Sequence, residues 1–463
     1  AWGCLRLSIV LKTNSTKCAR KGATDMKKVL SLGMAVVLTL SLTACGGRTE
    51  SKETTATQAQ GQTESAQSGK ETTQAASNVE LVATRWSGGQ SDDQKELVKG
   101  YTASEIVIDD VAYDKLKEKE TLSMQKSGGG DYDLIYVAEV WCPDYASNGW
   151  LLPLNDYIEK YNVDLSMYNQ SLLDTMTVDG KIMSLPTFTQ TSILAYDETA
   201  MQRYGGEVPK TFDELIACAK WFKENEGTGI VVPAMQGQAA VDLFGAILYS
   251  CGGEFIKDGK ADLGSDEAAQ AITIWQELCK YAMDGASTWH VDDVGQAMKD
   301  GVAPISISLS GNCSAYLDPE QSAVAETVKF AGMPGVGDKD YVGTANFWGW
   351  SVAANSENPD EAFQAAVWLT SPEQEKSASL ANGSISALPQ LAEDQEVLEK
   401  IPYLPAVTEA LAHARILPTA GDSSTMLTGL QAVLSEIATD PDTDSAALIK
   451  SYNESCKEYQ FGR

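Results

Sequence analysis

Short apolar runs alternate with amphipathic stretches from about residue 79 onward. Runs at 81–84, 106–108 and 133–137 have the length and composition of buried strands, and helical patterns at 92–101 and 113–127 separate them. Strands that alternate with helices in this way predict an α/β fold, with a mostly parallel sheet and helices on both faces.

Two helix start signals are legible further along the chain. Thr-Phe-Asp-Glu at 211–214 is a capping box that predicts a helix over 212–225. Ser-Pro-Glu-Gln at 371–374 is a second box, with proline at the first helical position. The remaining apolar patterns predict helices at 268–283 and 360–369 and strands at 303–309 and 328–333. No repeat with a period of 20–50 residues is present, which argues against a solenoid or a propeller.

The first part of the chain has the pattern of a secretory signal peptide. Met26, Lys27 and Lys28 precede an apolar stretch over 29–43, and small residues follow it. This order predicts a signal peptide at 26–44, since the apolar stretch is shorter than the roughly 20 residues that span a bilayer. Residues 1–25 are expected to be an upstream extension of the reading frame.

Leu-Thr-Ala-Cys at 42–45 resembles a bacterial lipobox, so Cys45 is predicted to carry the lipid that anchors the mature chain to the membrane. Residues 46–78 contain no Val, Ile, Leu, Met, Phe, Trp or Tyr. Such a segment cannot bury enough apolar surface to offset its ordering entropy, so 45–78 is expected to be a disordered linker behind the lipid.

Composition excludes several classes of protein. Lys and Arg total 35 against 64 Asp and Glu, a formal net charge of −29, which disfavours nucleic acid as a partner. The chain has two histidines and no Cys-x-x-Cys, P-loop, Gly-x-Gly-x-x-Gly or Gly-x-Ser-x-Gly motif. We therefore expect no metal site and no cofactor. Cys218 and Cys279 fall on apolar helix faces and are expected to be buried thiols. The sequence leaves open any disulfide pairing among the six cysteines that follow Cys45, which are Cys142, Cys218, Cys251, Cys279, Cys313 and Cys456.

Several local motifs occur in a specific order. They are GDYDLIYVAE at 130–139, YASNGWLLPL at 145–154, DGKIMSLP at 179–186, ILAYD at 193–197, VPKTFDEL at 208–215 and GWSVAANSENP at 349–359. In this order, behind a lipobox, they resemble extracellular solute-binding protein family 1 of bacterial ABC transporters, over essentially residues 79–463. Typical ligands of that family are sugars, oligosaccharides and polyols.

The resemblance implies an α/β, two-lobe periplasmic-binding-protein-like fold of type II, with mixed sheets flanked by helices and a hinge between the lobes. Lobe one is expected at 79–188 plus 343–386, and lobe two at 189–342 plus 387–463. The lobes would close on a ligand in the cleft. The chain would then act, without chemistry, as a monomeric lipoprotein outside the cytoplasm, at the outer face of the membrane or in the periplasm, and deliver the solute to membrane permease subunits.

A sugar offers apolar C–H faces and a rim of hydroxyls, which suit aromatic rings and carboxylate or amide side chains. Trp86 follows the first strand and Glu139 the third, where an α/β sheet opens to its crevice, and the family often has a ligand-contacting acid at the Glu139 position. The residues predicted to contact ligand are Trp86, Glu139, Trp141, Phe188, Gln190, Asp242, Asn346, Trp348 and Trp350. For Trp86, Trp141, Phe188 and Gln190, structural packing is an equal alternative. For His290, beside Trp289, a surface loop is preferred over a position in the cleft.

Two departures from the family pattern bear on the ligand. Gly311-Asn312-Cys313 lacks the aromatic residue that many relatives have there, and Met426-Leu427 stands where maltose-type relatives have a tryptophan. Long maltodextrins are therefore disfavoured, and a small sugar, a polyol or a different solute stays open. Two other classes also stay open: a surface glycan hydrolase with paired carboxylates, and an adhesion lipoprotein without a small ligand.

Overall fold

The computed structural model describes residues 79–461. The signal peptide, Cys45 and the linker predicted at 45–78 lie outside the described residues. The strands are β1 Glu80–Trp86, β2 Glu105–Val111, β3 Leu134–Ala138, β4 Thr177–Val178, β5 Lys181–Ile182, β6 Leu185–Gln190, β7 Ser192–Asp197, β8 Ile230–Val231, β9 Ile256–Lys257, β10 Lys260–Ala261, β11 Ile305–Leu309, β12 Val328–Ala331 and β13 Asn346–Val352. The helices are α1 Gly89–Leu97, α2 Tyr113–Met124, α3 Cys142–Ser147, α4 Asn155–Tyr161, α5 Gln170–Thr175, α6 Glu198–Tyr204, α7 Phe212–Glu226, α8 Gln238–Cys251, α9 Asp266–Lys280, α10 Val291–Lys299, α11 Pro359–Leu369, α12 Pro372–Asn382, α13 Gln395–Lys400, α14 Leu404–Ala412, α15 Ser423–Thr439 and α16 Ser445–Ser455.

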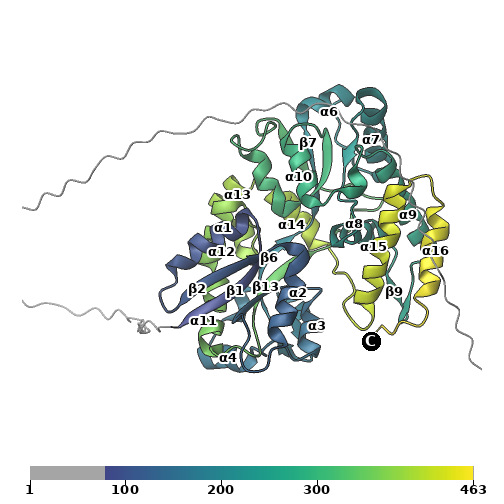
Figure 1. Ribbon diagram of the computed structural model, residues 1–463. Coiled ribbons are helices and arrows are strands. Elements are labelled where there is room, and N and C mark those ends of the chain that lie inside the picture. The colour runs from purple at the N-terminus through teal and green to yellow at the C-terminus, as the bar shows by residue number, and fades with distance from the viewer. Residues whose placement is uncertain (1–78, 462–463) are drawn as a thin grey trace, which may run out of the picture. The chain divides into compact units, whose positions relative to one another are not determined.

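The first of two main sheets has the strand order β2-β1-β3-β13-β6. The three strands expected at the start of the body pair in parallel, as their alternation with helices predicted. The late strand β13 inserts beside them and runs antiparallel to both β3 and β6 (Figure 1). The sheet is therefore mixed, and the expectation of a mostly parallel sheet holds only for its early strands.

Side chains of this sheet alternate between two apolar cores, as the two-residue period of a strand requires. Leu81 and Ala83 of β1 enter one core with Tyr136 of β3, whereas Ile135 and Val137 enter the core on the opposite face. Both faces are covered, which is why these strands read as continuous apolar runs.

The second main sheet has the order β12-β7-β11-β8, with β7 antiparallel to both of its neighbours. Its strand β7 begins two residues after β6 ends, so the chain passes from one sheet to the other at Thr191. The Thr191 hydroxyl donates to the Thr344 carbonyl (2.9 Å), just before β13 returns the chain to the first sheet. Two crossings thus lie side by side.

The capping box predicted at Thr211 is confirmed: its hydroxyl accepts from the Glu214 N–H (3.2 Å), and the Glu214 carboxylate accepts from the Thr211 N–H (3.3 Å). The box predicted at Ser371 is wrong, although α12 begins there with Pro372 at its first position. The Ser371 side chain makes no capping bond, and its N–H already donates to the Trp368 carbonyl (3.1 Å) at the end of α11. The Ser371 N–H that a capping box would use is therefore already bonded to the end of α11.

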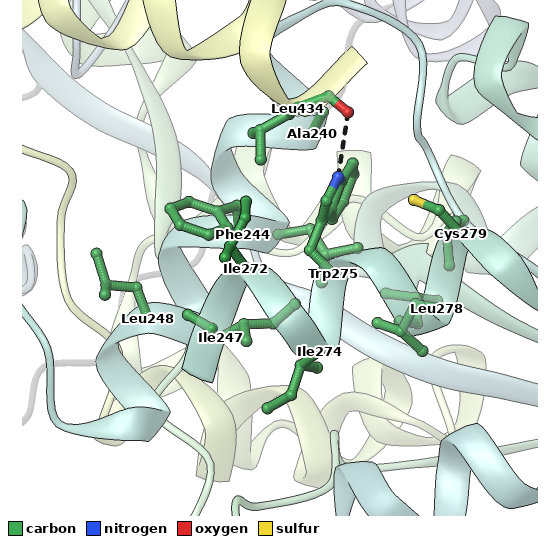
Figure 2. Packing of buried hydrophobic residues seen from close by; sticks show 14 of the residues in the cluster. Ala240, Phe244, Ile247, Leu248, Ile272, Ile274, Trp275, Leu278, Cys279 and Leu434 are labelled. Atoms are coloured by element: carbon green, nitrogen blue, oxygen red, sulfur yellow. Dashed lines mark hydrogen bonds between the residues drawn. The ribbon is translucent and has the colours of Figure 1, made fainter. Parts of the chain in front are cut away.

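Helices α8, α9 and α15 pack together in the core of the second sheet (Figure 2). Trp275 of α9 is fully buried, and its indole N–H donates to the Leu434 carbonyl of α15 (3.1 Å). Helix α8 is apolar on all sides and almost wholly buried. The only charged residue of this helix, Asp242, therefore sits in a low-dielectric setting.

Within residues 79–461, no helix is both long and apolar enough to span a membrane. The six cysteines of the body are all buried, free thiols, which confirms the expectation for Cys218 and Cys279. In the same part of the chain, no group of three or more His, Cys, Asp or Glu side chains is arranged to hold a metal ion.

Candidate functional site

A cavity of about 1260 Å³ is lined by residues from elements of both sheets. On one side are the segments after β1 and β3 together with β6 and β13, and on the other are α8, α10 and the 3₁₀ helix at Ser310–Leu317. Its volume lies above the roughly 300–1,000 Å³ of ordinary small-molecule pockets. Seven residues that the sequence singled out line it: Trp86, Glu139, Phe188, Gln190, Asp242, Asn346 and Trp348.

Aromatic rings form one wall of the cavity. The rings of Trp86 and Trp348 meet edge to face with centroids 4.4 Å apart, and Phe188 approaches Trp86 in the same manner at 5.8 Å. Tyr113 adds a further ring, 6.2 Å from Trp348. Edge-to-face contacts fix the orientation of each ring, so the wall is built before a ligand arrives.

Strand register explains why one tryptophan of β13 reaches the cavity and the other does not. Trp348 pairs with Ala138, the last residue of β3, at the edge of the sheet. Trp350 pairs with Tyr136 in the middle of β3, is 1% exposed and does not line the cavity. Trp350 is therefore corrected from a ligand contact to a residue of the core.

Trp141 also lies outside the cavity lining. It is partly buried, packs edge-on against Trp348 (5.1 Å) and lies 6.2 Å from Tyr113. Its contacts support the aromatic wall from behind. Ligand contact and structural packing were equal alternatives for Trp141, and its contacts in the structure are those of a packing residue.

Two buried carboxyl groups face the cavity. Glu139 follows β3 and is 2% exposed, and its Oε2 accepts from the Phe347 backbone N–H (3.1 Å). Asp242 of α8 is 4% exposed, and its Oδ1 accepts from the Gln238 amide (2.9 Å). The side chain of Asn346, the first residue of β13, hydrogen-bonds to both carboxyl groups. One amide thus links an acid of the first sheet to an acid of the helix beside the second.

Burial raises the pKa of both acids into the neutral range. The pKa of Glu139 rises to about 8, mainly because its charged form is desolvated and further because Asp242 is negative; hydrogen bonds from Phe347 and Asn346 oppose the rise. The pKa of Asp242 rises to about 7 through burial, against hydrogen bonds from Gln238 and Asn346. These groups therefore hold protons near neutral pH.

Three residues of the site were missed or misplaced from the sequence. Tyr113 is 39% exposed toward the cavity at the start of α2, and Gln238 lines it from the start of α8. Because β2 lies parallel beside β1, the loop after β2 had to open at the same edge as Trp86; that signal was available for Tyr113. His290, for which a surface loop was preferred over the cleft, lines the cavity, and its ring lies 6.1 Å from that of Tyr113.

The loop after β11 brings its backbone close to the site at Gly311. A Cβ at this glycine would meet Gln190 Oε1 and Phe188 Cζ, each at 2.7 Å, so the backbone itself closes on the site. The Gly311 carbonyl accepts from the Gln90 amide of α1 (3.4 Å), which ties the two sides of the cavity together. Tyr316 of the same 3₁₀ helix also lines the cavity.

Comparisons with known proteins agree with this architecture. A probable amino-acid ABC transporter periplasmic-binding protein of Sinorhizobium fredii is 23% identical over 321 residues, 65% of this chain and 70% of that protein. The maltotriose-binding protein of Pyrococcus abyssi is 24% identical over 374 residues, 78% of each chain. The maltose-bound structure of MalE3 from T. maritima superposes with a TM-score of 0.75 at 21% identity, over 81% of this chain and 98% of that one.

The structural likeness confirms the two-lobe α/β fold that the motifs implied. The family model described as bacterial extracellular solute-binding protein matches residues 88–376. Because that match spans more than half of the chain, the protein belongs to the family of bacterial extracellular solute-binding proteins.

Proposed function

We propose that the protein binds a sugar or a polyol in the cavity and passes it, unchanged, to the permease of an ABC importer. The observation that carries the proposal is the preformed wall of Trp86, Trp348 and Tyr113, which lines the same cavity as the hydrogen-bonding groups of Glu139 and Asp242. Aromatic faces cover the C–H surface of a sugar ring, and oxygen acceptors take its hydroxyl protons. The maltotriose-binding relative and the maltose-bound structure support this ligand class.

The same proposal includes the anchor and the motion. Cys45 carries the lipid that holds the mature chain at the outer face of the membrane, and the chain acts as a monomer. Lobe one, 79–188 plus 343–386, closes on lobe two, 189–342 plus 387–463, when ligand bridges the acids on the two sides. Loss of labelling by radioactive palmitate in Cys45→Ala tests the anchor, and a decrease in the radius of gyration with ligand, measured by small-angle X-ray scattering, tests closure.

A thermal-shift screen of the mature body tests the ligand class. The panel contains mono-, di- and oligosaccharides, polyols and amino acids. At a concentration of about 100 times Kd, a true ligand adds roughly 2.7 kcal/mol to the free energy of unfolding, which raises Tm by several degrees. A shift from at least one sugar or polyol is expected. Response only to amino acids, or to nothing in the panel, would contradict the proposal.

Replacing Trp86 by alanine tests the aromatic wall. Trp86 is half-buried at the cavity, so its loss is expected to weaken binding of the ligand found in the screen at least tenfold, about 1.4 kcal/mol, measured by titration calorimetry. Trp368→Ala is the matched control, since Trp368 packs on Tyr101 (5.0 Å) outside the cavity lining. Equal effects of the two substitutions would remove Trp86 from the site.

A glycan hydrolase is the competing function, since two acids face one cavity. Mass spectrometry of the bound sugar after prolonged incubation decides between them. We expect the sugar to be recovered intact, whereas shorter products that disappear in Glu139→Gln would establish hydrolysis.

A further inference from the structure

Among residues 79–461, the two cavity acids have no positively charged partner. The hydrogen bonds to Glu139 come from Phe347 and Asn346, and those to Asp242 come from Gln238 and Asn346; all of these donors are neutral. Within the described residues, neither carboxyl group forms an ion pair, and each repels the other. A pair of buried like charges with neutral donors alone is costly to ionise.

The other charged residues that line the cavity are mostly acidic. Of its lining residues, seven are acidic and two are lysines. The acids are Asp92, Asp93, Glu139, Asp242, Asp292, Asp318 and Glu399, and the lysines are Lys299 and Lys400. Low-dielectric walls focus the field of these charges, so the cavity attracts positive charge and repels anions.

One aromatic ring near both acids, that of Tyr113, is open to a cation in the cavity. Tyr113 lies close enough to Asp242 and Glu139 for both carboxylates to oppose ionisation of its phenol, and its exposed surface opens to the cavity. Trp86, by contrast, already has the Arg85 guanidinium over its ring at 4.9 Å. A cation in the cavity is therefore favoured beside Tyr113, where ring faces and carboxylates act together.

We propose that the physiological ligand carries a protonated amine on its hydroxylated ring, as an amino sugar does, and that the ammonium lies between Glu139 and Asp242. This rests on the proposed sugar-binding function and narrows its substrate class. The ammonium supplies the missing counter-charge to both acids, while its N–H groups donate to carboxylate oxygens that Asn346, Gln238 and Phe347 hold in place. The C–H faces of the sugar ring, with its remaining hydroxyls, then pack against the aromatic wall.

Matched sugar series test the amine directly. Titration calorimetry at pH 7, where the amino group is protonated, compares glucosamine, galactosamine and mannosamine, each with its N-acetylated form and with the parent hexose, and repeats the series with the corresponding disaccharides. The N-acetyl group removes the charge, and the hexose replaces nitrogen by oxygen. We expect at least one amine to bind tenfold or more tightly than both of its neutral counterparts.

Two variants separate the charge effect from a general loss of structure. In Glu139→Gln the affinity ratio of amine to neutral sugar should fall to about 1, with folding checked by Tm. In Glu120→Gln the ratio of amine to neutral-sugar affinity should be unchanged, because Glu120 is a buried acid of α2 that does not line the cavity. A neutral sugar that binds as tightly as its amine, or amines that give no heat at millimolar concentration, overturns the proposal. If neutral sugars bind as tightly as amines, the amine proposal fails and the sugar-receptor function stands. If no sugar binds, both proposals fail.

Discussion

Raising the pH from 5.5 to 8.5 is expected to lower the free energy of unfolding by an amount on the order of 10 kcal/mol. Within residues 79–461, four buried carboxyl groups have a clearly raised pKa, and desolvation is the main cause in each. The pKa rises to about 8 for Glu120 and Glu139 and to about 7 for Asp242 and Glu375.

The direction follows from where the protons are. Between the ordinary pKa of a carboxyl group and its raised value, the folded protein keeps a proton that the unfolded chain has released. Unfolding therefore releases protons, and each higher pH unit favours the unfolded state by about 1.4 kcal/mol per group until the folded group ionises. Acids with lowered pKa, such as Asp109, Asp360 and Asp394, titrate below this window and lose their contribution only in stronger acid.

Urea unfolding followed by tryptophan fluorescence at pH 5.5, 7.0 and 8.5 measures the effect. Glu120 isolates one group, because the Thr84 hydroxyl (2.7 Å) and the Tyr145 hydroxyl (3.0 Å) satisfy its carboxyl away from the cavity. Glu120→Gln should reduce the decline by about 3 kcal/mol. Glu118 is an exposed acid on the same helix, so Glu118→Gln should leave the decline in stability with pH unchanged. Stability that is constant or rises over this pH range would contradict the assignment of protonated buried acids.

Replacing Trp350 by alanine is expected to cost about 3–5 kcal/mol of stability, as for other large-to-small changes in a core. Its ring is 1% exposed and packs on Tyr136 with centroids 4.7 Å apart, so truncation leaves a cavity in the first sheet. Urea unfolding at a fixed pH measures the loss, and the folded fraction should bind ligand with an unchanged Kd.

Trp350→Phe and Trp86→Ala complete the comparison. The phenylalanine keeps most of the buried ring, so this variant should remain folded and bind normally. Trp86→Ala should show the opposite pattern, with weaker binding and a small change in stability. If Trp350→Phe weakens binding as much as Trp86→Ala does, then Trp350 contacts the ligand and its placement in the core is wrong.

Local pattern was sufficient for much of the fold. The early strands, the helix at Phe212 and the mixed α/β class all follow from apolar periodicity, one capping box and ordered motifs, because these features act between near neighbours in sequence. Positions at strand ends, such as Trp86 and Glu139, also indicated the cavity correctly, since the carboxyl ends of parallel strands share one edge of the sheet.

Tertiary structure alone decided which of these side chains meet. Periodicity placed Trp348 and Trp350 on one face of β13, but their depth depends on register with β3, which is set by pairing between distant segments. The contact that Asn346 makes with both Glu139 and Asp242, and the approach of His290 to Tyr113, likewise join residues brought together by the two chain crossings. The sequence by itself determined which elements form and which family they build. The charge of the cavity, and with it the expected ligand, depends on burial and proximity that exist only after both sheets have packed.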